Sequence, residues 1–300
     1  MITTALTRLF GLDHPIVLAP MGGVAGGALA AAVSNAGGLG LVGGGYGDAD
    51  WLRTELNAVR RATTRPWGAG LITWSASRAV LDQVLAARPH AVLLSFGDPR
   101  PHGALIKAAG CKLICQVQDL AGADLVVAQG AEGGGHGALR ATLPLVPAVV
   151  DALAPLPVLA AGGIADGRGV AAALMLGAQG ALVGTRFHAC DEALGSLRAR
   201  QCIVQASGDE TARTRVFDVV RGLDWPALYT GRALRNGFMA RWQGDEAGLA
   251  RDVSRQREAF QAAQRDEDFD TAMVWAGEAV DLIDDVAPAA HVVERLARDA

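Results

Sequence analysis

Residues 157–187, PVLAAGGIADGRGVAAALMLGAQGALVGTRF, contain the pattern that decides the fold. Two short apolar runs, Pro157–Ala161 and Ala181–Gly184, flank an Ala- and Leu-rich segment, Gly167–Leu176, with glycines at the junctions. Apolar runs of this length predict buried strands, and the segment between them is long enough for a helix. The stretch therefore predicts a βαβ unit, in which a helix connects two parallel strands.

The same alternation extends toward the N-terminus. We expect eight strands, at Ile16–Pro20, Leu39–Gly43, Trp67–Ile72, Ala91–Phe96, Lys112–Val117, Asp124–Gln129, Pro157–Ala161 and Ala181–Gly184. We expect helices at Gly27–Ala36, Ala49–Arg61, Ala76–Arg88, Pro101–Ala109, Thr142–Leu153 and Gly167–Leu176. The pattern predicts an α/β fold, a closed (β/α)₈ TIM barrel, with a doubly wound parallel sheet as the alternative.

One connection is too short for this scheme. Between the fifth and sixth strands stand only the residues 118–123, QDLAGA. A parallel crossover normally needs a dozen or more residues. Either the barrel lacks one outer helix here, so that the crossover is truncated, or the fifth strand is misassigned.

The C-terminal third has a different texture. Residues 205–276 are polar, rich in Arg and Asp and helical in pattern, with several Trp. We expect a helical substrate-binding cap domain over 205–276, and a barrel domain formed by 1–204 and 277–300. The last segment should end in a helix that closes the barrel.

The composition excludes several classes of protein. The chain has 300 residues, a net charge of −4 and 51% hydrophobic residues, which indicates a globular protein and no nucleic-acid partner. Its cysteines, Cys111, Cys115, Cys190 and Cys202, have neither disulfide nor zinc-site spacing, so we expect buried thiols and no metal. No signal peptide or membrane span is recognisable, so we expect a soluble, cytoplasmic protein. Nothing fixes the oligomeric state, and a homodimer is left open.

Glycine-rich turns end three of the predicted strands. Pro20, Met21 and Gly22 follow the first strand, where a barrel enzyme has its active site and a flat ligand needs close approach to the backbone. Gly162 and Gly163 follow the seventh strand, and Gly184 and Thr185 follow the eighth. In barrels these last two loops commonly bind phosphate through backbone N–H groups.

The sequence QGAEGGGHG, residues 129–137, follows the sixth strand. Gly135 and its neighbours suit no regular element, so the loop should lie against a ligand, and His136 is our candidate general base. His188, which follows the phosphate loop, is a second choice. Gln116 and Gln118 stand at the end of the fifth strand, two residues apart. Because side chains alternate between the two faces of a strand, both amides could point the same way, toward the edge of a heterocycle.

Together these pieces resemble the nitronate monooxygenase family, formerly called 2-nitropropane dioxygenases. The resemblance rests on residues 15–45, 67–74, 124–137, 157–187 and 216–236, the last reading VFDVVRGLDWPALYTGRALRN. They are spread in the right order over most of the chain, from residue 15 to residue 236, and only their combination is specific. The shortened connection after the fifth strand departs from the family.

The resemblance implies an FMN-containing (β/α)₈ barrel that oxidises alkyl nitronates with O₂ to a carbonyl compound and nitrite. By motif, Pro20, Met21 and Gly22 would line the flavin ring, and Gln116 would sit at its pyrimidine edge. Gly162, Gly163, Gly184 and Thr185 would hold the phosphate, Gly135 would contact the cofactor, and His136 would be catalytic. Two alternatives stay open: an NAD(P)H-dependent flavin reductase of the quinone or enoyl-acyl-carrier-protein type, and a barrel that binds FMN or another phosphate ligand without turnover.

Overall fold

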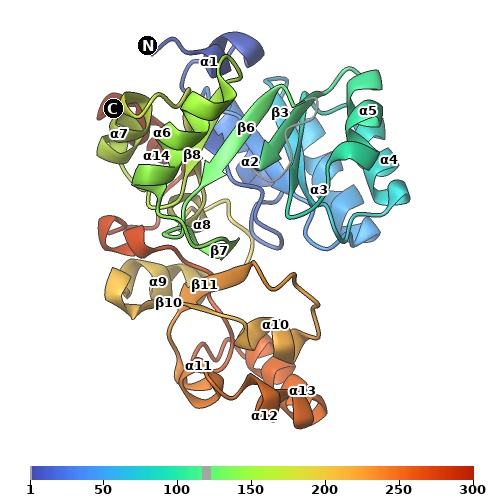
Figure 1. Ribbon diagram of the computed structural model, residues 1–300, viewed down its shortest axis with the longest axis vertical. Helices are drawn as coiled ribbons and strands as arrows, with labels where there is room; N and C mark the ends of the chain where they lie inside the picture. The colour runs from blue at the N-terminus through green and yellow to red at the C-terminus, as the bar shows by residue number, and fades with distance from the viewer. Residues whose placement is uncertain (1, 117–122) are drawn as a thin grey trace.

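The computed structural model of the chain describes residues 2–116 and 123–300 (Figure 1). Its centre is a sheet of eight parallel strands in the order β1-β9-β8-β6-β5-β4-β3-β2. The strands are β1 Ile16–Leu18, β2 Gly40–Gly43, β3 Trp67–Ile72, β4 Ala91–Ser95, β5 Lys112–Gln116, β6 Leu125–Gln129, β8 Val158–Ala161 and β9 Ala181–Val183. All eight predicted strands are present, within two residues of their predicted ends.

The two outer strands of this order close the sheet. Val17 in β1 forms a parallel bridge with Leu39, the residue before β2. The N–H of Leu18 donates to the carbonyl of Leu39 at 3.0 Å, and the N–H of Leu39 donates to the carbonyl of Ile16 at 2.9 Å. The sheet is therefore a TIM barrel, as predicted, and the doubly wound alternative is wrong.

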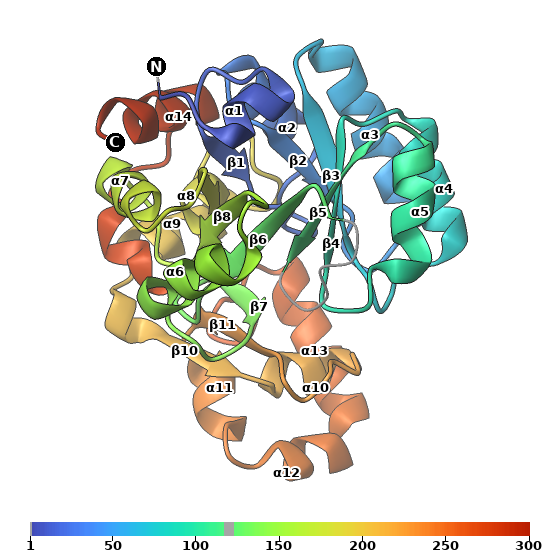
Figure 2. The same cartoon turned by 45° about the horizontal axis from the view of Figure 1, so that its top comes forward.

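Helices surround the barrel (Figure 2). They are α2 Gly27–Asn35, α3 Ala49–Ala62, α4 Arg78–Ala86, α5 Arg100–Ala108, α6 Thr142–Leu153, α7 Gly167–Met175 and α14 Ala289–Arg298. The C-terminal helix α14 contacts α7 and α2, and so fills the place beside the last and first strands. This confirms the expected closing helix.

A short helix that the sequence analysis missed, α1 Ala5–Phe10, covers the N-terminal end of the barrel. Leu6 and Phe10 are buried in one cluster with inward-facing strand residues such as Val17 and Leu93. Because strand side chains alternate, their neighbours Leu18 and Leu94 pack outward against the helices instead. The barrel interior is thus a packed core at this end.

The fifth strand was assigned correctly. β5 lies between β4 and β6 and pairs in parallel with both, with Gln116 opposite Val127. The predicted truncation concerns residues 118–123, of which 118–122 lie outside the described residues. Gln118 belongs to the same stretch, so its expected orientation also lies outside them.

The segment 205–276, here called the cap, lies below the barrel in Figure 1. Its α-helices are α10 Val216–Arg221, α11 Gly237–Trp242, α12 Glu246–Arg251 and α13 Val253–Arg265, and it contains the 3-10 helix Gly208–Glu210. Helix α9 Leu197–Gln205 leads into the cap, and the 3-10 helix Glu278–Leu282 follows it. Phe217, Phe238 and Phe260 are buried in the cap's own core.

The cap also contains strands, which corrects the expectation of helices alone. β10 Thr211–Thr214 and β11 Thr230–Leu234 join β7 Gly135–Gly137 in an antiparallel sheet of three strands. β11 is the central strand, and it pairs with the glycine loop of the barrel, with Gly231 opposite His136. Through this sheet the cap is attached directly to the loop that carries the candidate base.

Candidate active site

A cavity of about 800 Å³ opens at the carboxyl ends of the barrel strands and reaches under the cap. All ten site residues expected from sequence line it: Pro20, Met21, Gly22, Gln116, Gly135, His136, Gly162, Gly163, Gly184 and Thr185. Residues more than 160 positions apart along the chain therefore meet in one place. Parallel strands bring this about, because their carboxyl ends all lie at the same end of the barrel.

The turns after β8 and β9 form a cradle of backbone groups. Gly162 and Gly163 have φ values of +97° and +72°, which L-residues rarely adopt. A Cβ on Gly162 would lie 2.9 Å from the carbonyl oxygen of Gly130. The N–H groups of Gly163 and Thr185 find no acceptor within the described parts of the chain. Such open donors fit an anionic group like a phosphate.

Thr185 begins the short helix α8, Thr185–His188, directly after Gly184. Its hydroxyl oxygen accepts a hydrogen bond from the N–H of Gly277 at 3.0 Å. The hydroxyl proton is not used in that bond, so it remains available to a ligand in the cradle.

The turn after β1 packs closely against its neighbours. A Cβ on Gly22 would lie 2.8 Å from Cα of Gly45, and a Cβ on Gly70 would lie 2.2 Å from Cγ of Pro20. Neither glycine tolerates a side chain, because the neighbouring backbone or ring already occupies that space. Pro20 and Met21 therefore line the cavity from a turn whose backbone lies close to Gly45 and Gly70.

Gln116 belongs to a relay of amides. Its Nε2 donates to Oε1 of Gln129, at 2.5 Å, and Nε2 of Gln129 donates to the carbonyl of His136, at 2.9 Å. The relay fixes the Gln116 amide and connects β5 to the glycine loop. Gln129 also lines the cavity, and the sequence analysis did not predict this part for it.

His136 forms a buried pair with Asp218. Its Nε2 lies 2.9 Å from Oδ1 and 3.0 Å from Oδ2 of Asp218, and the side chains are 7% and 2% exposed. A carboxylate so placed accepts a hydrogen bond from Nε2–H, which in the neutral imidazole leaves the lone pair on Nδ1. Nδ1 has no partner in the described part of the chain. It is the nitrogen that remains for chemistry.

One face of the His136 ring is covered. The indole of Trp225 stacks on it, with ring centroids 3.5 Å apart and planes at 2°. Phe96 and Trp275 approach the same ring at 6.5 Å and 5.2 Å between centroids. Phe96 has φ +63°, a strained value for an aromatic residue at the end of β4. The imidazole is therefore held in one plane.

The cap supplies three residues that sequence analysis missed. Asp218 and Arg221 lie on α10, and Trp225 follows it, all inside the quoted VFDVVRG segment and its continuation. The sequence did offer a signal for Asp218, which stands between apolar residues in VFDVV. A carboxylate is rarely buried without a partner, so its position indicated a partner elsewhere in the chain. Arg221 is the one Lys or Arg among the residues that line the cavity. Its guanidinium lies 5.3 Å from the ring centroid of Tyr46.

His188, the second choice, is buried in the cavity wall without an acid. Its Nδ1 lies 3.4 Å from the carbonyl of Trp275, and burial lowers its pKa to about 4. It is neutral at physiological pH. Cys190 is buried as expected, and burial raises its pKa to about 12. Within residues 2–116 and 123–300, no cluster of His, Cys, Asp and Glu could hold a metal ion.

Among the described residues, no helix has the length and apolar character needed to cross a membrane.

Comparison with known protein families gives independent evidence on which proteins this chain resembles. The family model described as nitronate monooxygenase matches residues 3–88 and 77–299. A nitronate monooxygenase from Pseudomonas aeruginosa is 33% identical, with 84% of this chain and 96% of that protein covered. A Mycobacterium tuberculosis protein, (3aS,4S,5R,7aS)-5-hydroxy-7a-methyl-1-oxo-octahydro-1H-indene-4-carboxyl-CoA dehydrogenase, is 37% identical over 72% of this chain. The match spans 64% of that dehydrogenase's own length.

Two solved structures are similar over nearly the whole chain. FabK from Thermotoga maritima has a TM-score of 0.88 at 31% identity, with 100% of this chain and 96% of that chain covered. A nitroalkane oxidase from Streptomyces ansochromogenes has a TM-score of 0.84 at 30% identity, with 99% and 97% covered. The barrel and the cap therefore recur together in these proteins.

Proposed function

The chain belongs to the nitronate monooxygenase family, a family of oxidoreductases, and on that premise we propose that it oxidises alkyl nitronates with FMN and O₂. The products are a carbonyl compound and nitrite. The observation that carries the proposal is the buried His136–Asp218 pair, in which His136 lines the same cavity as the glycine cradle.

The cavity fits FMN in its donor set and shape. Gly162, Gly163, Gly184 and Thr185 would hold the phosphate through N–H groups and a hydroxyl. Pro20, Met21 and Gly22 would line the flavin ring, and Gly135 and Gln116 would contact it, Gln116 at the pyrimidine edge. When bound, the flavin supplies the redox chemistry, moving electrons from the nitronate to O₂.

His136 acts on the substrate through Nδ1. With a neutral nitroalkane, the lone pair on Nδ1 accepts the proton from the α-carbon, and the Nδ1–H so formed donates to the nitronate and orients it. A nitronate that enters as the anion is oriented by the imidazolium, in which both ring nitrogens are donors. Asp218 keeps the imidazole in the required tautomer and stabilises the imidazolium that forms. Arg221 adds a positive charge that attracts an anionic substrate. Trp225 and Phe96 exclude water from this side of the ring.

We further propose that the chain divides into a barrel domain, residues 1–204 and 277–300, and a cap domain, residues 205–276. The cap contributes Arg221 and Trp225 to the cavity lining, and Asp218 to the buried pair with His136. Substitutions in the cap should therefore change which nitronate is used and leave flavin binding intact.

A second candidate is an NAD(P)H-dependent flavin reductase. The similarity to FabK and to a CoA-ester dehydrogenase favours it, because neither name refers to a nitro compound. Membership of an oxidoreductase family weighs against a barrel that binds FMN without turnover. The buried pair at His136 is compatible with either reaction. What distinguishes the two is whether a nitronate or NAD(P)H gives its electrons to the flavin.

Turnover of the flavin-loaded protein with propyl-2-nitronate in air tests the proposal. We expect oxygen uptake, nitrite and acetone from the wild type, and FMN retention without turnover from His136→Ala. Full activity in His136→Ala would remove His136 from the mechanism. Absence of nitrite from the wild type, with oxidation of NADH instead, would favour the reductase.

A further inference from the structure

The glycine loop that carries His136 cannot hold its own shape. Gly133, Gly134 and Gly135 precede the histidine, and glycine leaves the backbone more free than any other residue. The strand β7 that it forms is three residues long and lies at the edge of its sheet. The position of the imidazole must therefore be fixed by contacts from outside the loop.

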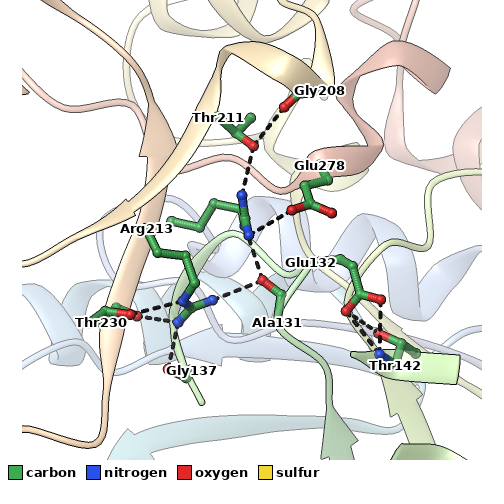
Figure 3. Close-up of polar contacts among 10 residues, drawn as sticks. Ala131, Glu132, Gly137, Thr142, Gly208, Thr211, Arg213, Thr230 and Glu278 are labelled. Atoms are coloured by element: carbon green, nitrogen blue, oxygen red, sulfur yellow. Dashed lines mark hydrogen bonds and ion pairs between the residues drawn. The ribbon is translucent and has the colours of Figure 1, made fainter. Parts of the chain in front are cut away.

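One guanidinium bridges the two ends of this loop. Nη1 of Arg213 donates to the carbonyl of Ala131 at 2.9 Å, and its Nη2 donates to the carbonyl of Gly137 at 2.5 Å (Figure 3). Ala131 precedes the glycines and Gly137 follows His136. Figure 3 shows the Arg213 side chain reaching both carbonyls from the cap. A planar fork of donors suits this geometry, which a single ammonium cannot reproduce.

The other donors of Arg213 fasten the guanidinium to β11. Its Nε donates to Oγ1 of Thr230 at 2.9 Å, and Nη2 also donates to the carbonyl of Thr230. Thr230 is the residue that pairs with Gly137 across the two strands. The side chain thus repeats and reinforces the backbone contact between the cap and the glycine loop.

The charge on Arg213 is not neutralised by a partner of its own. In the described ranges no carboxylate lies within ion-pair distance of it, whereas its neighbour Arg232 pairs with Glu278 at 2.7 Å. Burial and the charge of Arg232 lower the pKa of Arg213 to about 10. Glu278 attracts Arg213 from beyond ion-pair distance, so the guanidinium is held by its hydrogen bonds to backbone carbonyls and to Thr230 and not by an ion pair.

The far side of the loop is closed by the residues that follow the cap. A Cβ on Gly134 would lie 2.8 Å from the backbone nitrogen of Gly277. The N–H of Glu278 donates to the carbonyl of Glu132 at 2.9 Å. The loop therefore lies between residues 276–278 on one side and the Arg213 guanidinium on the other. Within the loop, Arg232 donates to Ala131 alone and Gln129 to His136 alone, so among the described residues it is Arg213 that donates to both Ala131 and Gly137.

We propose that Arg213 is a positioning residue, which holds the His136 loop so that the imidazole meets Asp218 and keeps Nδ1 toward the substrate. This rests on the proposed use of His136 in catalysis. Arg213 itself touches no substrate, since it does not line the cavity. A displacement of a catalytic group by about 1 Å can cost about 100-fold in rate, so the loss should appear in kcat.

Two substitutions in the flavin-loaded protein test this, Arg213→Ala and Arg213→Lys. We expect kcat with propyl-2-nitronate to fall about 100-fold in Arg213→Ala, with KM and FMN content little changed. Added guanidinium ion should restore part of the rate in Arg213→Ala. Arg213→Lys keeps the charge but not the fork, so it should stay slow. If Arg213→Lys is as fast as the wild type, only the charge is needed and the proposal fails.

A readout independent of turnover is the proton on His136 Nε2. In ¹⁵N-histidine-labelled protein we expect a slowly exchanging signal, assigned by its loss in His136→Gln. That signal should broaden or vanish in Arg213→Ala and Arg213→Lys. If it is unchanged, Arg213 does not position His136. Should the wild type fail to oxidise nitronates, the proposed function fails, but this signal still tests the role of Arg213.

Arg200→Met is the matched control. Arg200 also bridges backbone carbonyls, those of Asp191, Ala193 and Gly195, but it makes no contact with the His136 loop. Its replacement should leave the His136 signal in place. Loss of the signal in Arg200→Met as well would mean that any loosening of the chain displaces His136, which would overturn a specific role for Arg213.

Discussion

His136 lies in the barrel's glycine loop and Asp218 in the cap, and the imidazole Nε2 stands 2.9 Å and 3.0 Å from the two carboxylate oxygens. The two residues are 82 positions apart in the chain. The candidate base is therefore assembled only when the cap is docked on the barrel. A base completed in this way connects the folding of the cap to the reactivity of the cavity.

The first prediction concerns Asp218→Asn. The amide keeps the shape of the side chain but no longer favours the Nε2–H tautomer. By analogy with other His–Asp pairs, we expect turnover to fall by about 10²- to 10⁴-fold, with FMN still bound. Anaerobic reduction of the flavin by nitronate, followed by absorbance, measures this. A rate within about threefold of the wild type would show that Asp218 is structural only.

The second prediction concerns the cradle. Gly162→Ala places a methyl group 2.9 Å from the carbonyl of Gly130 and strains a backbone at φ +97°. We expect the Kd for FMN to rise at least tenfold, about 1.4 kcal/mol, measured by titration of the apoprotein. Gly244→Ala is the control, because Gly244 has φ +94° with open space around it and does not line the cavity. Equal weakening in both variants would argue against a phosphate cradle.

The third prediction concerns Trp225, which is 2% exposed and stacks on His136. Trp225→Ala should lower the free energy of unfolding by about 3–5 kcal/mol, because it removes a buried indole. Urea unfolding measures this loss. Trp74, a neighbouring indole that is 36% exposed, provides the comparison, and Trp74→Ala should cost much less. Similar losses for the two variants would mean that Trp225 is not well packed.

The fourth prediction concerns pH. Burial lowers the pKa of His188 from 6.5 to about 4, so the folded state binds its proton less readily than the unfolded chain. This histidine therefore costs nothing above pH 6.5, and the free energy of unfolding falls as pH drops from 6.5 toward 4, by about 3 kcal/mol. Urea unfolding at pH 7 and pH 4 should show a smaller decrease in His188→Gln than in the wild type.

The control for this effect is the exposed His291 on α14. The variant His291→Gln should keep the full decrease in stability between pH 7 and pH 4. The account is contradicted if His188→Gln loses as much stability over that range as the wild type does.

The barrel could be predicted closely because its signals are local. Three barrel helices, α3, α4 and α7, begin at a residue whose side chain caps them, such as Asp166, whose carboxylate accepts from the N–H of Gly169 at the start of α7. Strands such as Trp67–Ile72 are short apolar runs between such signals. The ten candidate residues could be brought to one end of the barrel because they lie at or shortly after the ends of predicted strands, and their roles stay predictions.

The cap could not be predicted in the same way, because its signals are not local. Gly135–Gly137 is a strand only because Thr230–Leu234 pairs with it, and no property of a GHG tripeptide indicates that partner. The same holds for Asp218, whose role depends on a histidine in another part of the chain. The role of Arg213 could not be predicted either, because its acceptors are oxygens of Ala131, Gly137 and Thr230, which only the fold brings together.

The most direct test of the central claim is anaerobic stopped-flow absorbance of the flavin-loaded protein, mixed separately with propyl-2-nitronate and with NADH. We predict that the nitronate removes the visible flavin absorbance, that NADH does not, and that nitrite forms when air is admitted. Bleaching by NADH alone would contradict nitronate oxidation and favour the reductase. Protein that takes up no FMN would contradict the cofactor, and with it the roles of Gly162, Gly163, Gly184 and Thr185.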